Sequence, residues 1–232
     1  MCAIYQPAAA DTIRELFQAP EVTFDYKPEC YPGYSAPVLL ASEAAADELV
    51  PVRAMFGLVP PWAKDTKISR MTYNARSETI AKLPSYKKAW AERRYCVVPA
   101  SSFYEPNYES GKPVRWAIKR ADGQPFGIAA IWERWKTPEG DWMRSFSMVT
   151  INATEHPLMR RFHAPDDEKR SIVVIPPDRY QAWLHADTED EARSHLAPFN
   201  PDEFMAEAAP APPSKRKKPE GRAAESAPDA EG

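Results

Sequence analysis

The stretch RRYCVVPASSFYEP, residues 93–106, is the best indicator of the fold, because it is rich in β-branched and aromatic residues. Its first part, residues 93–100, predicts a β-strand. Five other segments share this character and are bounded by turn residues, namely 36–42, 114–120, 126–132, 144–152 and 171–177. Three helices are predicted, at 11–19, 86–94 and 177–186. Many strands with few helices between them predict an α+β fold with a mixed, mostly antiparallel, partly closed sheet.

The composition predicts one folded domain followed by a tail. Of the 232 residues, 44% are hydrophobic and 11% are aromatic, as in globular proteins. From about residue 206 the chain consists of Ala, Pro, Ser and charged residues, and such a segment buries too little apolar surface to fold. We therefore expect a single domain over residues 1–205 and a disordered tail over residues 206–232.

Charge and cysteine content indicate the compartment. The formal net charge of −3 gives no overall basic field that would indicate nucleic acid. The three cysteines form neither a C-x-x-C pair nor a Cys/His cluster, which argues against a metal site and a disulfide framework. The sequence shows no signal peptide and no apolar run of about 18 residues. We expect a monomeric protein of the bacterial cytoplasm, associated with the nucleoid and without metal or organic cofactor.

Cys2 follows the initiator methionine directly, and this position suggests chemistry. Removal of Met1 would place a free α-amino group and a thiol on one residue. Both groups titrate near neutral pH, at about 8 and about 8.5 in model compounds. Such a residue acts either as an N-terminal nucleophile on amides or as a trap for aldehydes, through an imine that closes to a thiazolidine. The alternative is a small buried hydrophobe near a chain end.

Asn74 and Arg76 occur in the stretch TYNARSETI. If this stretch is extended, the two side chains point to the same face and suit an anionic or carbonyl oxygen. The alternative is a surface loop in which Ser77 caps a helix.

Glu105 and His163 are candidates for proton transfer. Glu105 lies beside two aromatic residues, and desolvation there would raise its pKa toward the range of a general acid or base. His163 precedes the strand predicted at 171–177 and could carry protons at neutral pH. The alternatives are a solvent-facing loop glutamate and a structural histidine that binds backbone groups.

A basic and aromatic stretch runs from Lys64 to Arg94. Nine Lys and Arg residues, Arg70 among them, stand against three acidic residues, which gives a local charge of +6. Four aromatic residues are interleaved, namely Trp62 just before the stretch, Tyr73, Tyr86 and Trp90. This pattern indicates a surface that follows a phosphate backbone and stacks on bases. The alternative is a basic helix face with core aromatics.

Taken together, these segments resemble the SOS-response-associated peptidase family, whose members shield abasic sites. The resemblance rests on Met-Cys at the start, then FGLVPPWAKD, NARSET, RRYCVVPASSFYEP, FGIAAIWERW, FSMVTINAT, the His163 segment and WL, in this order. It covers most of residues 1–196. No single piece is specific, but the ordered set is.

The resemblance implies a mixed α/β fold with a β-barrel-like core and a few peripheral helices. It implies that Cys2 bonds to the ring-opened aldehyde of an abasic site in single-stranded DNA. Asn74 would hold Cys2 or the sugar oxygen, and Glu105 and His163 would assist ring opening and proton transfer. Contacts with DNA would come from Arg76, Trp62 and Pro32, and from Lys64 and Arg70 of the basic stretch. The family name adds peptidase activity, as removal of the residue before Cys2, and a lyase activity belongs to the same expectation.

The sequence departs from the family pattern in three places. MCAI replaces the usual Met-Cys-Gly-Arg, SFYEP replaces Gly-Phe-Tyr-Glu-Trp, and HAPDDEKR replaces His-x-Arg-Met-Pro. Lys169 or Arg170 is a candidate to take the place of the missing arginine. The four candidate catalytic residues are present despite these changes.

Three functions are therefore compared. The leading hypothesis is a sensor that crosslinks to abasic sites through Cys2. The second is an N-terminal-nucleophile amidohydrolase or protease, which would turn over amide substrates. The third is a non-catalytic single-stranded-DNA-binding module, which would bind intact strands with steep salt dependence and would not need Cys2.

Overall fold

Five strands close into a barrel in the computed structural model, which describes residues 2–45 and 47–211. The strands are β2 (Ser35–Ala41), β3 (Leu49–Phe56), β5 (Tyr95–Asn107), β7 (Phe126–Lys136) and β8 (Trp142–Asn152). β5 pairs with β7, β7 with β8, β8 with β3, β3 with β2, and β2 again with β5. Only the β3–β8 pair is parallel within this ring. The predicted mixed, mostly antiparallel fold with a barrel-like core is confirmed.

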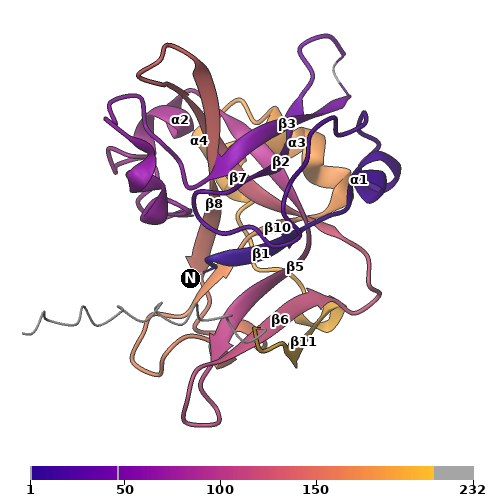
Figure 1. The fold of residues 1–232 in the computed structure, drawn as a ribbon. Helices are drawn as coiled ribbons and strands as arrows, with labels where there is room; N and C mark the ends of the chain where they lie inside the picture. Colours follow the sequence, from indigo (N-terminus) through magenta and orange to yellow (C-terminus); the bar gives the residue numbers. More distant parts are fainter. Residues whose placement is uncertain (1, 46, 212–232) are drawn as a thin grey trace, which may run out of the picture.

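Six further strands extend the sheet. β1 (Ile4–Pro7) and β6 (Val114–Arg120) pair with the second half of β5, and β11 (Phe204–Ala208) pairs with β6. β4 (Asn74–Arg76) and β9 (Arg170–Ile172) pair with β8, whereas β10 (Val174–Ile175) pairs with β7. Figure 1 shows that β5 runs from the barrel into the smaller layer formed with β6 and β11. The end of the long strand β5 therefore leaves the barrel close to β1.

The helices are short and lie outside the barrel (Figure 1). They are α1 (Ala10–Leu16), α2 (Lys87–Ala91), α3 (Tyr180–Leu184) and α4 (Glu189–Ser194), with single 3₁₀ turns at Thr66–Arg70, Met159–Arg161, Pro177–Arg179 and Pro201–Glu203. None of the described helices is long and apolar enough to cross a membrane. Their apolar residues cover the outer face of the barrel strands.

The core lies on both faces of the barrel strands, which explains why β5 is apolar at consecutive positions. Cys96 and Val98 belong to one buried cluster with Phe56 and Phe146. Val97 points to the opposite face and belongs to a second buried cluster, which includes aromatic and aliphatic residues of the helices. The indole of Trp183 in α3 donates a hydrogen bond to the carbonyl oxygen of Cys96 at 3.0 Å and fixes the helix layer to the barrel.

The predicted strands and helices all correspond to elements of the structure, with differences in length. β5 continues to Asn107, beyond the predicted end at residue 100, and the predicted strand 171–177 divides into β9 and β10. β1, β3, β4, β11 and α4 were not predicted. β11 extends three residues past the domain boundary that we predicted at 205, and residues 212–232 of the predicted tail lie outside the described residues.

Candidate functional site

Cys2 and Asn74 are brought together although 72 residues separate them. The side-chain amide of Asn74 donates a hydrogen bond to the carbonyl oxygen of Cys2 at 2.8 Å. β4 holds Asn74 in place, because its carbonyl oxygen also accepts a hydrogen bond from the Tyr86 hydroxyl at 3.0 Å. The side-chain oxygen of Asn74 is buried and accepts no hydrogen bond within the described part of the chain. Asn74 therefore offers one acceptor beside Cys2.

Glu105 and His163 form a buried pair. Nε2 of His163 lies 3.1 Å from a carboxylate oxygen of Glu105, and the two side chains are 5% and 2% exposed. Glu105 lies in the part of β5 that leaves the barrel, beside the first residues of β1. The solvent-facing alternative for Glu105 is therefore wrong, because β5 continues as a strand and buries this side chain.

His163 has a strained backbone that its neighbours hold in place. Its φ angle of 68° lies in the left-handed region, which is unfavourable for residues other than glycine. Its N–H donates to the carbonyl oxygen of Pro106 at 2.9 Å, next to Glu105. Nζ of Lys169 donates to the carbonyl oxygens of Ala164 at 2.5 Å and His163 at 3.4 Å. Lys169 thus closes the loop that presents the imidazole.

Arg170, the other candidate for the missing family arginine, has a different role. Its guanidinium is buried and binds both carboxylate oxygens of Glu78 at 2.9 Å, and it also contacts Glu168 and Thr150. Arg170 therefore joins β9 to the segment after β4. Of the two candidates, only Lys169 contacts the His163 backbone.

The thiol of Cys2 is 1% exposed, and Sγ lies 3.5 Å from the carbonyl oxygen of Ile4. Burial raises the pKa of this thiol well above its usual range, and the negative charge of Glu105 raises it further. The thiol therefore keeps its proton at neutral pH until another group accepts it. The pairing of Ile4 with Tyr104 brings the start of the chain alongside Glu105.

Burial of Cys30 gives a stability prediction. Burial raises the pKa of this thiol from 9.0 to about 12, so the folded state retains a proton that the unfolded chain releases. The buried thiol therefore contributes its full amount to the free energy of unfolding below pH 9.0. This contribution is lost as the pH rises toward about 12. Three pKa units correspond to roughly 4 kcal/mol at most. We expect Cys30→Ala to flatten the alkaline fall in the free energy of unfolding, measured with denaturant between these pH values; an unchanged slope contradicts the assignment.

Tyr73 is a site residue that the sequence analysis placed only in the basic stretch. Its ring packs edge-on against Phe56, with centroids 5.9 Å apart. Tyr73 also packs against the buried cluster that contains Cys2. Burial raises the pKa of Tyr73, and the neighbouring Cys2 and Glu105 side chains raise it further. The sequence offered one indication that Tyr73 belongs to the site, namely that it directly precedes Asn74. Neighbouring residues at the start of a strand lie near the same edge of the sheet.

The loop between β3 and β4, residues 57–73, carries three of the predicted DNA contacts. Trp62 is 58% exposed, and its indole N–H donates to the carbonyl oxygen of Pro84 at 3.4 Å. Lys64 and Arg70 are also exposed. The loop folds back at Gly57, whose φ is 102° and where an added Cβ would lie 2.1 Å from the carbonyl oxygen of Ser69. Only glycine fits there, so this loop conformation is specified locally.

The basic stretch does not form one surface. Tyr86 and Trp90 are buried in the core, as the alternative of core aromatics predicted. In the same stretch several cations make ion pairs, such as Lys88 with Glu92. Arg76 also pairs with a carboxylate, at 3.0 Å from Glu168. Within residues 57–94, exposed aromatic and basic side chains occur together only in the loop 57–73.

Pro32 lies in the turn that follows an isolated bridge between Cys30 and Tyr5. This bridge places the turn alongside β1, which is the strand that begins just after Cys2. Pro32 is half-buried and Tyr34 is exposed. The described residues contain no group of three or more His, Cys, Asp or Glu side chains that could hold a metal ion.

The fold and the site together define a class of mixed-barrel proteins in which a cysteine near the start of the chain lies beside an asparagine and a buried Glu–His pair. The family model described as SOS response associated peptidase (SRAP) matches residues 1–210. The chain belongs to this family.

Relatives and solved structures agree with this assignment. The chain is 33% identical over 154 residues to the abasic site processing protein YoqW of Bacillus subtilis, covering 65% of each chain. It is 29% identical over 151 residues to the chicken abasic site processing protein HMCES, covering 53% of this chain and 45% of that protein. The chain thus spans about two thirds or less of these relatives. A crystal structure of a Bordetella bronchiseptica protein matches with a TM-score of 0.82 and 32% identity, over 90% of this chain and all of that one.

Proposed function

We propose that this protein captures abasic sites in single-stranded DNA by a covalent bond to Cys2 and so shields the lesion. The observation that carries the proposal is the convergence of Cys2, Asn74, Glu105 and His163 from four separate segments. The names of the relatives support it, since YoqW and HMCES are described as abasic site processing proteins.

The chemistry begins with removal of Met1, which frees the α-amino group of Cys2. The amine adds to the aldehyde carbon of the ring-opened sugar, and loss of one water gives an imine. The sulfur then adds to the imine carbon, its proton passes to the nitrogen, and a thiazolidine closes. After hydrolysis of the Met1–Cys2 peptide bond, which consumes one water, the net change of the capture itself is one molecule of water lost from protein and DNA. No external oxidant or reductant is needed.

The side chains around Cys2 have separate roles in this scheme. The free side-chain oxygen of Asn74 would accept a hydrogen bond from the amine and orient its lone pair. Glu105 would take the proton of the thiol, whose raised pKa otherwise keeps it protonated. His163 would exchange protons with the sugar hydroxyl during ring opening, while its contact with Glu105 holds its ring.

Binding of the strand would use the loop 57–73 and the turn at Pro32. Trp62 would stack on a base, and Lys64 and Arg70 would contact phosphates. Arg76 would first have to exchange Glu168 for a phosphate, because the two side chains are paired.

The experiment compares three single-stranded oligonucleotides of one sequence. One carries an abasic site, one a tetrahydrofuran site that lacks the aldehyde, and one is intact. We expect a species stable to denaturation only with the first, with the mass of protein without Met1 plus oligonucleotide minus water. Equal binding of all three without an adduct would favour the DNA-binding module, and repeated cleavage of amide substrates would favour the amidohydrolase.

Lys169 provides a prediction about positioning. Lys169→Ala frees the carbonyl groups of His163 and Ala164 and lets the strained backbone relax, so we expect the crosslinking rate to fall by about tenfold or more. Affinity for the tetrahydrofuran strand should change little, and Lys169→Arg should restore part of the rate. Lys136→Ala, at an exposed position on β7, is the control. Equal loss of affinity and rate would show that Lys169 acts on DNA binding instead.

A further inference from the structure

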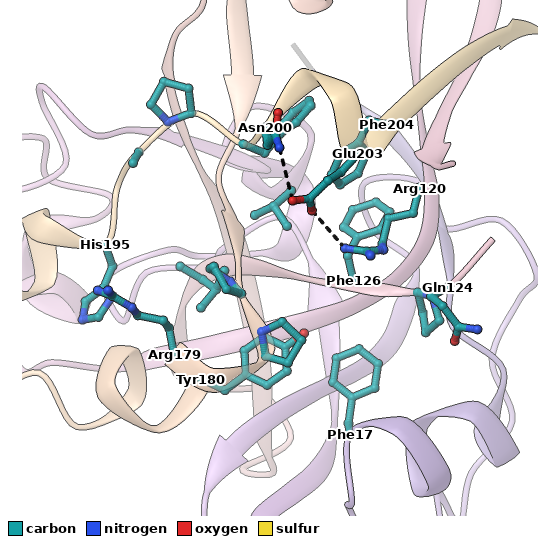
Figure 2. A pocket seen from close by; sticks show the side chains of 18 of the residues that line it. Phe17, Arg120, Gln124, Phe126, Arg179, Tyr180, His195, Asn200, Glu203 and Phe204 are labelled. Atoms are coloured by element: carbon teal, nitrogen blue, oxygen red, sulfur yellow. Dashed lines mark hydrogen bonds and ion pairs between the residues drawn. The ribbon is translucent and has the colours of Figure 1, made fainter. Parts of the chain in front are cut away.

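A cavity of about 670 Å³, shown in Figure 2, is lined by residues outside the Cys2 site. Its lining includes Phe126, which pairs with Ala100 on β5, five residues before Glu105. This corresponds to roughly 17 Å of strand. No candidate residue of the Cys2 site lines the cavity. Its volume falls in the range of sites that enclose a small molecule or a peptide side chain, about 300–1,000 Å³.

The floor of the cavity is apolar and preformed. Phe17, directly after α1, stacks on Tyr180 of α3, with ring centroids 5.5 Å apart and 10° between the planes. Phe126 packs edge-on against Phe204, and Phe199 packs against Phe204 at 4.4 Å. Four prolines also line the cavity and restrict backbone movement, namely 125, 176, 177 and 198. A large apolar side chain could therefore enter with little rearrangement of the protein.

The charges around the cavity are divided between its two ends, as Figure 2 shows. At one end, Arg120 is neutralised by Asp122 and Glu203, and Glu203 also accepts a hydrogen bond from Asn200. At the other end, Arg179 is exposed and makes no ion pair within the part of the chain that the structure describes.

His195 lies next to Arg179. Burial lowers the pKa of His195, and the positive charge of Arg179 lowers it further, so the imidazole is mostly neutral at pH 7. Glu191 on α4 acts in the opposite direction. Among the described residues, the end at Arg179 therefore presents one positive charge without an ion-pair partner.

We infer that this cavity binds the C-terminal residue of a partner polypeptide, with a large apolar side chain on the aromatic floor and the terminal carboxylate on Arg179. A single carboxylate matches the single unpaired charge. A nucleic acid fits less well, because Asp122 and Glu203 would repel its phosphates. Residues 209–232 of this chain are not the occupant, since they contain no aromatic, Leu, Ile, Val or Met residue.

The test measures fluorescence anisotropy with fluorescein-labelled hexapeptides that are identical except at the C-terminus. The probes end in a Phe carboxylate, a Phe amide or a Gly carboxylate, and N-acetylphenylalanine serves as a competing small molecule. We expect saturable binding of the Phe carboxylate, at least about tenfold weaker binding of the amide, and a similar loss with the Gly peptide. Displacement by N-acetylphenylalanine only at much higher concentration would show that the preceding peptide backbone contributes.

Exposed residues provide variants that should fold normally. Arg179→Ala should weaken the Phe carboxylate peptide by about tenfold and leave the amide peptide unchanged. Leu16→Ala, at the half-exposed lip of the cavity, should weaken both Phe peptides. Arg14→Ala on the same helix, outside the cavity, is the matched control. Absence of saturable binding at about 1 mM peptide, or equal affinity for carboxylate and amide, would overturn the inference.

Discussion

Replacement of Cys2 by alanine should abolish the covalent adduct with abasic single-stranded DNA. Alanine retains the α-amino group, so an imine can still form, but without sulfur no thiazolidine closes and the imine hydrolyses. We expect the adduct that survives denaturation to fall by about a hundredfold or more, because the capture step loses its nucleophile. The measurement is the amount of crosslinked oligonucleotide on a denaturing gel, with intact mass as a second readout.

Cys30→Ala is the matched control for this change. Cys2 and Cys30 are both free, both 1% exposed, and both belong to the same buried cluster, so the two variants lose a similar volume from the core. We expect Cys30→Ala to crosslink at nearly the rate of the parent protein. Reduction of the imine with borohydride should recover an adduct in Cys2→Ala, which would separate loss of the thiol from loss of DNA binding. An undiminished adduct in Cys2→Ala without borohydride would exclude the thiazolidine.

Replacement of Glu105 by glutamine should give the second-largest effect. Glutamine keeps the size of the side chain but cannot accept the thiol proton, and it removes the charge beside His163. General acid–base catalysis typically contributes about 10²–10⁴-fold, so we expect the single-turnover crosslinking rate to fall by at least about a hundredfold. DNA affinity, measured with the tetrahydrofuran strand, should stay within a factor of about three.

The pair of Glu105 and His163 should act as a unit. His163→Gln alone should slow the reaction to a similar extent, and the double variant should be little slower than the slower single variant, because groups in contact have non-additive effects. Glu109→Gln is the control, since Glu109 is half exposed and pairs with Arg161. Thermal unfolding of each variant checks that a lower crosslinking rate does not result from loss of the folded state. Multiplicative losses in the double variant would show that the residues act independently.

The candidate site residues differ in how much of their role the sequence alone could predict. Cys2 could be singled out from its position after Met1, because its chemistry depends on the α-amino group and not on the surrounding fold. Trp62 was also accessible to sequence reasoning, and it is exposed. Tyr86 and Trp90 lie in the basic stretch that follows Trp62 but are buried, and local composition could not distinguish these cases.

Glu105 shows the limit of local patterns most clearly. The strand pattern was assigned only to residues 93–100, so Glu105 was placed beyond the predicted strand. In the structure β5 continues to Asn107, because β1 and β6 pair with its second half on either side. The burial of Glu105 depends on these partners, which come from residues 4–7 and 114–120. Likewise, the contact between Lys169 and the His163 backbone depends on how the loop between them closes.

The sequence by itself determined the class of fold, four of the five strand segments of the barrel and the chemical types available at the site. These follow from apolar patterning and from residue chemistry, which act over a few positions along the chain. The tertiary structure alone decided that β5 closes the ring with β2, that Glu105 is buried against His163, and that Asn74 binds the Cys2 carbonyl. These features require contacts between segments tens of residues apart, and such contacts depend on the packing of the whole barrel.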